Sequence, residues 1–397
     1  MKYTAPSLLA LAVSSLMLSS TAAMAADPLT QALAGGKATI QLRPRLELVE
    51  QDGAVDSATA LTLRSVLGYE TAPIEGIKAY VEFEDIRALV DNYSVPVVQP
   101  NAKYAVVADP ELTQVNQAFF SGYGVKLGRQ KIVIDNARFV GDVGWRQNDQ
   151  TFDALSYQTK ALVPWLNLSV AYANQINSIN GQSGEVELPI VHAKASTPIG
   201  ANIGLTWVGL KGKETVGLGS ALKAASRQHA ALRIDGKYQQ FLYDLGYAKQ
   251  DDYAGSAVAN ADYYALMLGY DFGKAKLSVQ QEGLESGFAT PLATLHAFNG
   301  WADKFLATPT AGLVDTNIKL SGAYAGFNLA AAYHRFESEQ GSTHYGDEID
   351  LSAAKKLNAN TTGLLKIAHY QGGNDATTPA ALTLDQTKLW LQLDYKF

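Results

Sequence analysis

The sequence predicts an all-β fold, a transmembrane antiparallel up-and-down β-barrel of about 18 strands with inward-folded loops. Three observations lead to this prediction. Apolar and polar residues alternate with a period of two along many short segments, and short and long connections alternate between these segments. The chain then ends in one more alternating segment that closes on an aromatic residue.

The first 25 residues have the pattern of a secretory signal peptide. Lys2 precedes an apolar stretch from Leu8 to Met17, and Ala23-Met24-Ala25 is a small-residue cleavage site. The stretch is too short for a spanning helix, so we expect residues 1–25 to be removed and residues 26–397 to form one exported domain. The chain has no cysteine, which excludes disulfides and thiolate metal sites. Its formal net charge of −6 argues against nucleic acid as a partner.

The alternation is clear from the first predicted strand onward. Ile40, Leu42 and Leu46 share one face of this strand, and Arg43 and Arg45 share the other. A soluble sandwich would bury the apolar face, whereas a membrane barrel turns it to lipid and keeps the polar face in the lumen. Segments of this kind begin near residues 38, 58, 77, 113, 125, 152, 166, 187, 202, 228, 241, 261, 275, 313, 327, 344, 361 and 387.

The connections favour the barrel over the sandwich. Short turns alternate with long loops such as 91–112, 135–151 and 286–312. Outer-membrane barrels have short turns at one end and long loops at the other, and a sandwich has no reason for this asymmetry. The last strand, 388–397, alternates up to a terminal Phe397, which resembles the signal read by the barrel assembly machinery of bacteria.

The stretch 127–157 is the most informative one for function. We predict a strand over 125–134, a polar loop, and a second strand from near Phe152. The loop keeps aromatic and arginine anchors, so we expect it to fold into the lumen and narrow it, the alternative being an ordinary surface loop.

Two blocks of the sequence resemble a known family. The first block comprises Leu127-Gly128-Arg129-Gln130, Val140-Gly141, Trp145-Arg146-Gln147-Asn148 and Thr151-Phe152-Asp153. The second comprises residues 295–305, Thr308-Pro309, Gly312-Leu313 and Asp315, followed by 333–336 and 346–350. Both resemble the alginate export domain family of outer-membrane β-barrel porins, and the resemblance covers essentially the mature chain. It implies an 18-stranded barrel and, in the family's best-known role, export of an anionic polyuronate. The shorter chain and the mixed charges of the predicted lumen argue here for smaller solutes.

Candidate pore-lining residues are the basic side chains on the polar faces and in the inward loop. Arginine suits this role because its planar fork binds carboxylates bidentately, although lumenal arginines also brace barrels by pairing with acidic residues. The candidates are Arg43, Arg45, Arg64, Arg129, Arg138, Arg146, Arg233 and Lys237. Arg129 and Arg146 rank first because they match the family motif. The expected loop anchors are Phe139, Trp145, Asp153, Trp301 and Asp303.

The sequence therefore predicts an outer-membrane channel for passive passage of hydrophilic solutes, most of all anionic sugars, uronates or organic acids. The alternatives are a general porin without selectivity and a barrel whose external loops bind a partner or surface. We expect no enzyme, because the six histidines are scattered and no nucleophile, metal or nucleotide motif is present. We also expect no cofactor, no metal and a monomer.

Overall fold

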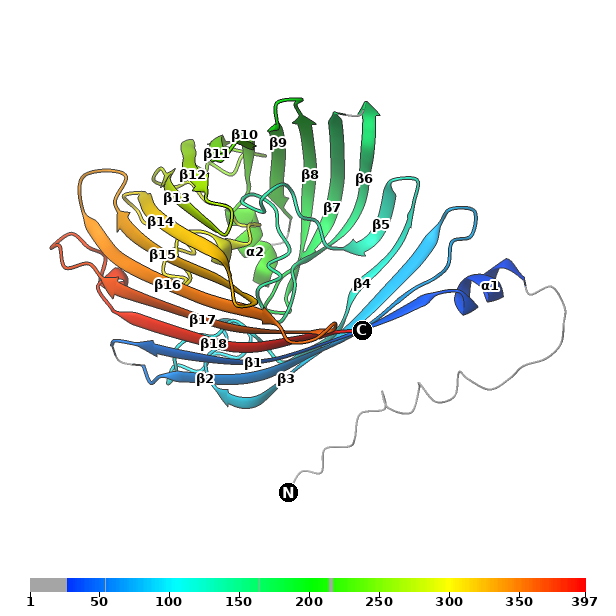
Figure 1. Cartoon of the computed structure of the whole chain (residues 1–397), viewed down its shortest axis with the longest axis horizontal. Coiled ribbons are helices and arrows are strands. Elements are labelled where there is room, and N and C mark those ends of the chain that lie inside the picture. Colours follow the sequence, from blue (N-terminus) through cyan, green and yellow to red (C-terminus); the bar gives the residue numbers. More distant parts are fainter. Residues whose placement is uncertain (1–26, 54, 164, 214–216) are drawn as a thin grey trace, which may run out of the picture.

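The computed structural model describes residues 27–53, 55–163, 165–213 and 217–397, so the predicted signal peptide lies outside the described residues. Within this part the chain forms one antiparallel sheet of 18 strands. The sheet closes on itself because β1 pairs with both β2 and β18 (Figure 1). Every strand pairs antiparallel with its neighbours in sequence, which confirms the predicted fold class and strand number.

The strand bounds follow the predicted starts closely. The strands are β1 (Lys37–Gln51), β2 (Ala58–Glu70), β3 (Lys78–Asn92), β4 (Leu112–Gly122), β5 (Val125–Gln130), β6 (Thr151–Val163), β7 (Leu166–Asn177), β8 (Ser183–Ser196), β9 (Ala201–Gly212), β10 (Arg227–Tyr238), β11 (Phe241–Asp251), β12 (Ala261–Asp271), β13 (Ala275–Leu284), β14 (Leu313–Tyr324), β15 (Phe327–Glu337), β16 (His344–Lys356), β17 (Thr361–Gly372) and β18 (Gln386–Lys396).

Two strand predictions were wrong in their bounds. β5 ends at Gln130 rather than near Ile134, and β8 begins at Ser183 rather than Glu187. β5 stops early because Ile132 and Ile134 leave the sheet and bury their side chains inside the barrel, each only 7% exposed. Apolar residues that continue a strand pattern can thus belong to a loop when the loop packs inside the wall.

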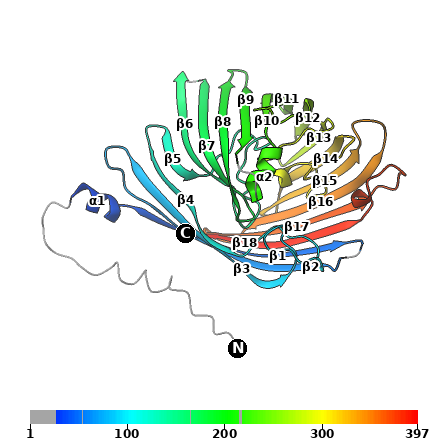
Figure 2. The same cartoon turned by 180° about the vertical axis from the view of Figure 1, so that it is seen from behind.

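The two ends of the barrel differ, as predicted. We call the end with short connections, such as 239–240 and 325–326, the turn end, and the opposite end, with 93–111, 131–150 and 285–312, the loop end. The helix α1 (Pro28–Ala34) lies beside the turn end, next to the start of β1 (Figures 1 and 2). None of the described helices is long and apolar enough to cross a membrane.

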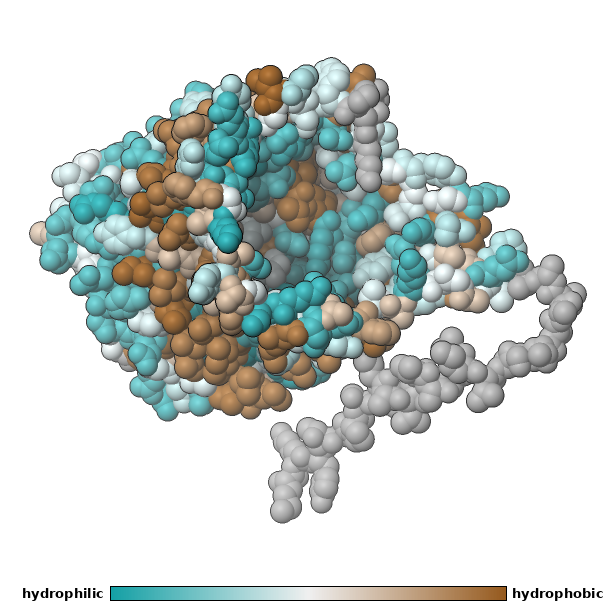
Figure 3. Space-filling view, in the orientation of Figure 1, coloured by the Kyte–Doolittle hydropathy of each residue, from teal (hydrophilic) through white to brown (hydrophobic). Residues whose placement is uncertain are grey.

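The outer face of the barrel is apolar. On β9 and β12, for example, Leu205, Leu266 and Leu268 are exposed while their neighbours in sequence face inward. Apolar side chains gather on the flank where β16 to β18 and β1 lie, and the face shown in Figure 3 is hollowed. A continuous apolar surface of this kind is unfavourable in water and is typical of a barrel whose outer face contacts the hydrocarbon of a lipid bilayer.

Three long loops fold back inside the barrel. Loop 93–111 packs Val95, Ala105 and Val107 on the loop-end halves of β1 and β2. Loops 131–150 and 285–312 meet each other and the wall, with the 3-10 turn η2 (Leu295–Ala297) in the second loop. The helix α2 (Gly217–Ala224) also lies within the ring of strands in Figure 1 and buries Leu222.

Candidate functional site

Loop 131–150 crosses the lumen between two different walls. Its first part packs Ile132, Ile134 and Val140 on the inner faces of β7 to β9, which are apolar. The expectation of a polar lumen is therefore wrong for the loop-end halves of these strands, where Leu188 and Ile190 face inward. Nearer the turn end, the inward side chains of β8 are His192 and Lys194, as expected. The polar loop residues Trp145 to Asp149 lie at the opposite wall, against β1 and β2.

The β1–β2 wall holds the loop by its backbone. Arg43 donates from Nη1 to the carbonyl oxygens of Gly144, at 3.2 Å, and Arg146, at 3.3 Å. Arg45 donates to the carbonyl oxygen of Trp145. Gln147 donates to Thr62 Oγ1 at 2.8 Å. These contacts make Arg43 and Arg45 braces of the loop as well as inward-facing residues.

Arg146 lies at the centre of a buried ion-pair network. Its guanidinium pairs with Glu47 at 3.1 Å, Asp303 at 3.0 Å and Asp109 at 4.0 Å, and its side chain is 7% exposed. Burial alone would lower the pKa of Arg146, but Glu47, Asp109 and Asp303 outweigh it and raise the pKa above its usual value. Arg146 therefore stays charged and ties loop 131–150 to β1, to loop 93–111 and to loop 285–312.

Trp145 is enclosed by aromatic and basic groups. It stacks on His296 with ring centroids 4.5 Å apart, and Arg45 and Lys366 lie over its ring at 4.4 and 4.2 Å. Lys366 also lies 3.7 Å from the centre of the Trp301 ring. These cation–π contacts place both predicted anchors, Trp145 and Trp301, around one buried lysine of β17.

His296 joins the same cluster through both ring nitrogens. Its Nδ1 lies 2.7 Å from Asp303 Oδ1, and its Nε2 lies 2.7 Å from Lys366 Nζ. Burial lowers the pKa of His296 to about 3, against the opposing effect of Asp303. Burial would raise the pKa of Asp303, but His296, Lys388 and Arg146 hold it well below its usual range. The ring is thus neutral at pH 7 and donates its Nδ1 proton to Asp303.

Arg64 forms a second braced point on β2. It pairs with Glu84 of β3 at 2.5 Å and with Asp149 of the loop, which also pairs with Lys131. Arg64 and Asp149 are almost fully buried. This network holds the end of loop 131–150 just before β6.

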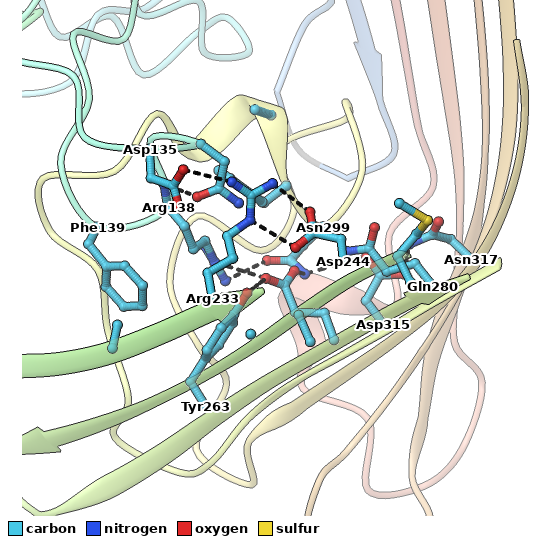
Figure 4. Close-up of a pocket in the computed structure, with 18 of the residues that line it drawn as sticks. Asp135, Arg138, Phe139, Arg233, Asp244, Tyr263, Gln280, Asn299, Asp315 and Asn317 are labelled. Atoms are coloured by element: carbon cyan, nitrogen blue, oxygen red, sulfur yellow. Dashed lines mark hydrogen bonds and ion pairs between the residues drawn. The ribbon is translucent and has the colours of Figure 1, made fainter. Parts of the chain in front are cut away.

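Arg138 lies against a cavity of about 240 Å³ on the turn-end side of the loops, which we call the inner cavity (Figure 4). Its Nε lies 2.9 Å from Glu282 Oε1, and its guanidinium faces the rings of Tyr263 and Phe298. Burial would lower the pKa of Arg138, but Glu282 outweighs it and raises the pKa. Phe139 also lines this cavity and packs against Tyr263 at 5.9 Å.

Arg233 of β10 lies on another side of the inner cavity. It pairs with Asp244 of β11 at 2.6 Å and with Asp135 of the loop at 2.9 Å. Burial would raise the pKa of Asp135, but Lys194 and Arg233 lower it below its usual value. Lys237 lies four residues further along β10, nearer the turn end, and pairs with Asp271 at 2.8 Å.

Arg129 does not lie with the other candidates. It shares the face of β5 with Val125 and Leu127, which are exposed on the outside of the barrel. Arg129 instead pairs in a fork with Asp153 of β6, at 2.7 and 3.1 Å. The register therefore does not bring Arg129 or Asp153 to the lumen.

Several lysines on the inward faces near the turn end have no ion-pair partner among the described residues. They are mostly exposed, whereas inward carboxylates near this end are already paired, for example Glu70 with Lys78 and Asp394 with Arg43. These turn-end lysines are Lys37, Lys126, Lys276, Lys319, Lys356 and Lys396. They leave an excess of positive charge at the inner rim.

Sequence reasoning missed the partners of the predicted cations. Glu282, Asp109 and Lys366 are each buried and each contact a residue far away in the chain. For Glu282 and Lys366 a signal existed, since a charged residue at an inward position of a predicted strand must face the lumen. The pairings themselves depend on how the loops fold and have no signal in one sequence.

Comparisons with known proteins agree on the fold. The chain is similar to the crystal structure of OccAB4 from Acinetobacter baumannii, with a TM-score of 0.67 and 10% identity over 91% of this chain and 98% of that one. It is similar to the outer membrane protein opdK from Pseudomonas aeruginosa, with a TM-score of 0.68 and 12% identity over 91% and 99%. OccAB3 from Acinetobacter baumannii gives 0.69 and 12% over 92% and 100%.

No family model matches the chain, and no curated protein matches it. The resemblance to the alginate export family thus stays a prediction. The fold is a closed 18-stranded antiparallel barrel, and it is similar to the barrels of OccAB4 from Acinetobacter baumannii and OccK8 from Pseudomonas aeruginosa.

Proposed function

We propose that this protein is an outer-membrane channel that lets small hydrophilic solutes diffuse passively between the external side and the periplasm. The proposal depends on one observation. A closed barrel with an apolar outer face encloses loops that narrow its lumen, and the lumen keeps a cavity lined by polar as well as apolar residues. An apolar belt outside and a polar inner cavity are what a water-filled passage through lipid requires. The turn end would face the periplasm.

The preferred solutes are small anions such as uronates, sugar acids or other organic acids. The turn-end lysines support this preference, because unpaired positive charge at one mouth raises the local concentration of anions. The buried arginines support it less, since Glu47, Glu84 and Asp303 already neutralise Arg146 and Arg64. Passage of an extended polyuronate chain is disfavoured, because the inward loops are fixed to several sides of the lumen and narrow it.

Planar-bilayer recordings of the refolded mature protein test the proposal. We expect stable ohmic openings. In a salt gradient, the sign of the reversal potential should show a preference for anions. Exchange of Lys276, Lys319 and Lys356 for Gln should move that potential toward zero while the barrel stays folded. Openings without anion preference would leave a general porin, and a folded barrel that never conducts would overturn the channel itself.

A further inference from the structure

Two cavities of the barrel interior meet at one side chain. The inner cavity, of about 240 Å³, is lined by Arg138 and Asn299 together with residues of β10 to β16. A second cavity, of about 320 Å³, lies toward the loop end among Phe288 to Pro291 and Phe305 to Thr308. We call it the outer cavity. Arg138 and Asn299 line both cavities, so they form the partition between them.

The Arg138 guanidinium fills this partition. The side chain is almost completely buried and lies 4.6 Å from the centre of the Phe298 ring and 5.3 Å from that of Tyr263. Glu282 faces its Nε at 2.9 Å and is itself held by the Tyr263 hydroxyl at 2.7 Å and by Asn299 Nδ2 at 2.7 Å. The charge of Arg138 is thus compensated within the wall of β12 and β13.

The outer end of the guanidinium is held less firmly than its Nε. Nη1 lies 3.4 Å from Thr290 Oγ1 and Nη2 lies 3.3 Å from Asn299 Oδ1, and both acceptors are neutral. Nε and Glu282 form an ion pair rather than a hydrogen bond, and the attraction between two buried opposite charges exceeds that of long hydrogen bonds to neutral acceptors. The η nitrogens can therefore leave Thr290 and Asn299 while the ion pair with Glu282 persists.

We propose that Arg138 is the gate residue of the channel. In the closed arrangement its guanidinium separates the outer from the inner cavity, and a swing of its η end away from Thr290 and Asn299 joins them. A passing solute takes over the hydrogen bonds that these two residues release. The inference rests on the proposed channel function and adds the residue at which passage is controlled. That residue is Arg138, and not Arg129 or Arg146.

Single-channel conductance distinguishes a gate from a structural brace. Arg138→Ala should raise the conductance about twofold or more and shift selectivity toward cations, because Glu282 loses its counter-charge at the narrowest point. Arg138→Ala combined with Glu282→Ala should keep the raised conductance and reverse the cation shift. Arg138→Lys, which retains the charge on a thinner side chain, should raise the conductance without a cation shift. Arg87→Ala is the matched control, since Arg87 pairs with Asp85 on the outer face.

Labelling of single cysteines tests the position of the gate independently, and the absence of native cysteines makes this straightforward. Ala289→Cys reports the outer cavity and Ala265→Cys the inner one. A membrane-impermeant anionic methanethiosulfonate is added only at the loop side of protein in vesicles. We expect Ala265→Cys to react about tenfold more slowly than Ala289→Cys, and Arg138→Ala to abolish most of that difference.

The outcomes separate the two proposals. Unchanged conductance in every Arg138 variant, or equal labelling at both positions with Arg138 present, overturns the gate and leaves the channel. A folded wild-type barrel that never conducts overturns the channel function. Folding of each variant is checked by its heat-modifiable migration in gels, and Arg138→Lys keeps the test valid if the alanine variants do not fold.

Discussion

The lumen of this barrel has two contrasting walls, and the same loop rests on both. On the loop-end halves of β7 to β9 the inward side chains, such as Leu188, Ile190 and Val208, are apolar and covered by Ile132 and Ile134 of loop 131–150. We call this the apolar wall. On β1 and β2 the inward Glu47 and Arg64 pair with the other end of the loop, and on β18 the inward Lys388 pairs with Asp303 of loop 285–312. We call this the charged wall.

The contrast shows two ways of fixing a loop inside a pore. Burial on the apolar wall stabilises the loop in proportion to area, without direction and without dependence on pH. The charged wall contributes little net free energy, since buried ion pairs barely repay the desolvation of their members, but it specifies one arrangement. The loop is thus anchored by the apolar wall and positioned by the charged wall, where Arg146 joins three carboxylates.

The largest effect should come from breaking the charged wall at its centre. Arg146→Ala removes the cation that Glu47, Asp109 and Asp303 share. Asp303 keeps Lys388 and Asp109 keeps Arg45, but Glu47 loses its ion-pair partner, and an uncompensated buried charge costs about 3–5 kcal/mol. We expect the protection of amides 143–150 against hydrogen exchange to fall by that free energy, while the strands keep theirs. Arg335→Ala, an exposed arginine paired with Glu337, is the control. Unchanged protection would show that the apolar wall alone holds the loop.

The apolar wall should respond nearly as strongly but in a different way. Leu188 is fully buried against the loop, and Leu188→Ala leaves a cavity that costs about 2–4 kcal/mol. The loss, measured by urea unfolding in micelles, should be the same at pH 7 and pH 5 because no charge is involved. Leu205→Ala on the outer face of β9 should cost less, since Leu205 is 57% exposed. A pH-dependent loss would refute the separation of the two walls.

Acid should loosen the charged wall selectively, through His296. Its pKa is about 3 in the folded loop and about 6.5 when the loop is released, so only the released state takes up a proton between these values. The closed loop therefore loses about 2 kcal/mol between pH 7 and pH 5. Asp303, whose pKa is lowered, adds a further loss only below its ordinary value. The loss begins as pH falls through 6.5 and is absent above it.

The measurement is the frequency of channel openings, or amide exchange of residues 295–305, as a function of pH. Asp303, Lys366 and Arg146 are the ionisable groups nearest His296, and of these four side chains only the histidine has an ordinary pKa between pH 7 and pH 5. His296→Gln offers a donor to Asp303 and an acceptor to Lys366 and should remove the pH step. A pH step that survives in His296→Gln would place the titrating group elsewhere.

The sequence predicted the strands well because the alternation of apolar and polar residues along a lipid-facing strand is visible in the sequence itself. It also predicted the inward loop, from anchors that a solvated loop would not keep, such as Trp145. It failed at Ile132 and Ile134, where apolar residues serve an inner wall instead of a strand. It could not give the pairs Arg146–Asp303 or Arg138–Glu282, because each joins segments more than a hundred residues apart and depends on how loop 131–150 folds inside the barrel.

Arg129 gives the smallest expected effect and sharpens the comparison with the charged wall. Its fork with Asp153 has the geometry of a strong pair, but the two side chains are 28% and 30% exposed on the outer face. The pair lies at the loop-end edge, where β5 ends at Gln130 and β6 begins at Thr151, and exposed pairs that solvent screens contribute about 0–1 kcal/mol. The sequence already held this answer, since Arg129 stands two residues from the outward-facing Leu127.

We expect Arg129→Ala to change the free energy of unfolding, measured by urea titration, by less than about 1 kcal/mol. The conductance and the reversal potential should stay unchanged. Arg146→Ala, a substitution of the same chemistry on the other side of the wall, provides the contrast in the same recordings. If Arg129→Ala altered selectivity, the pair would have to face the solute path, and the strand register of β5 would be contradicted. Burial would then no longer explain which of the two arginines matters for the channel.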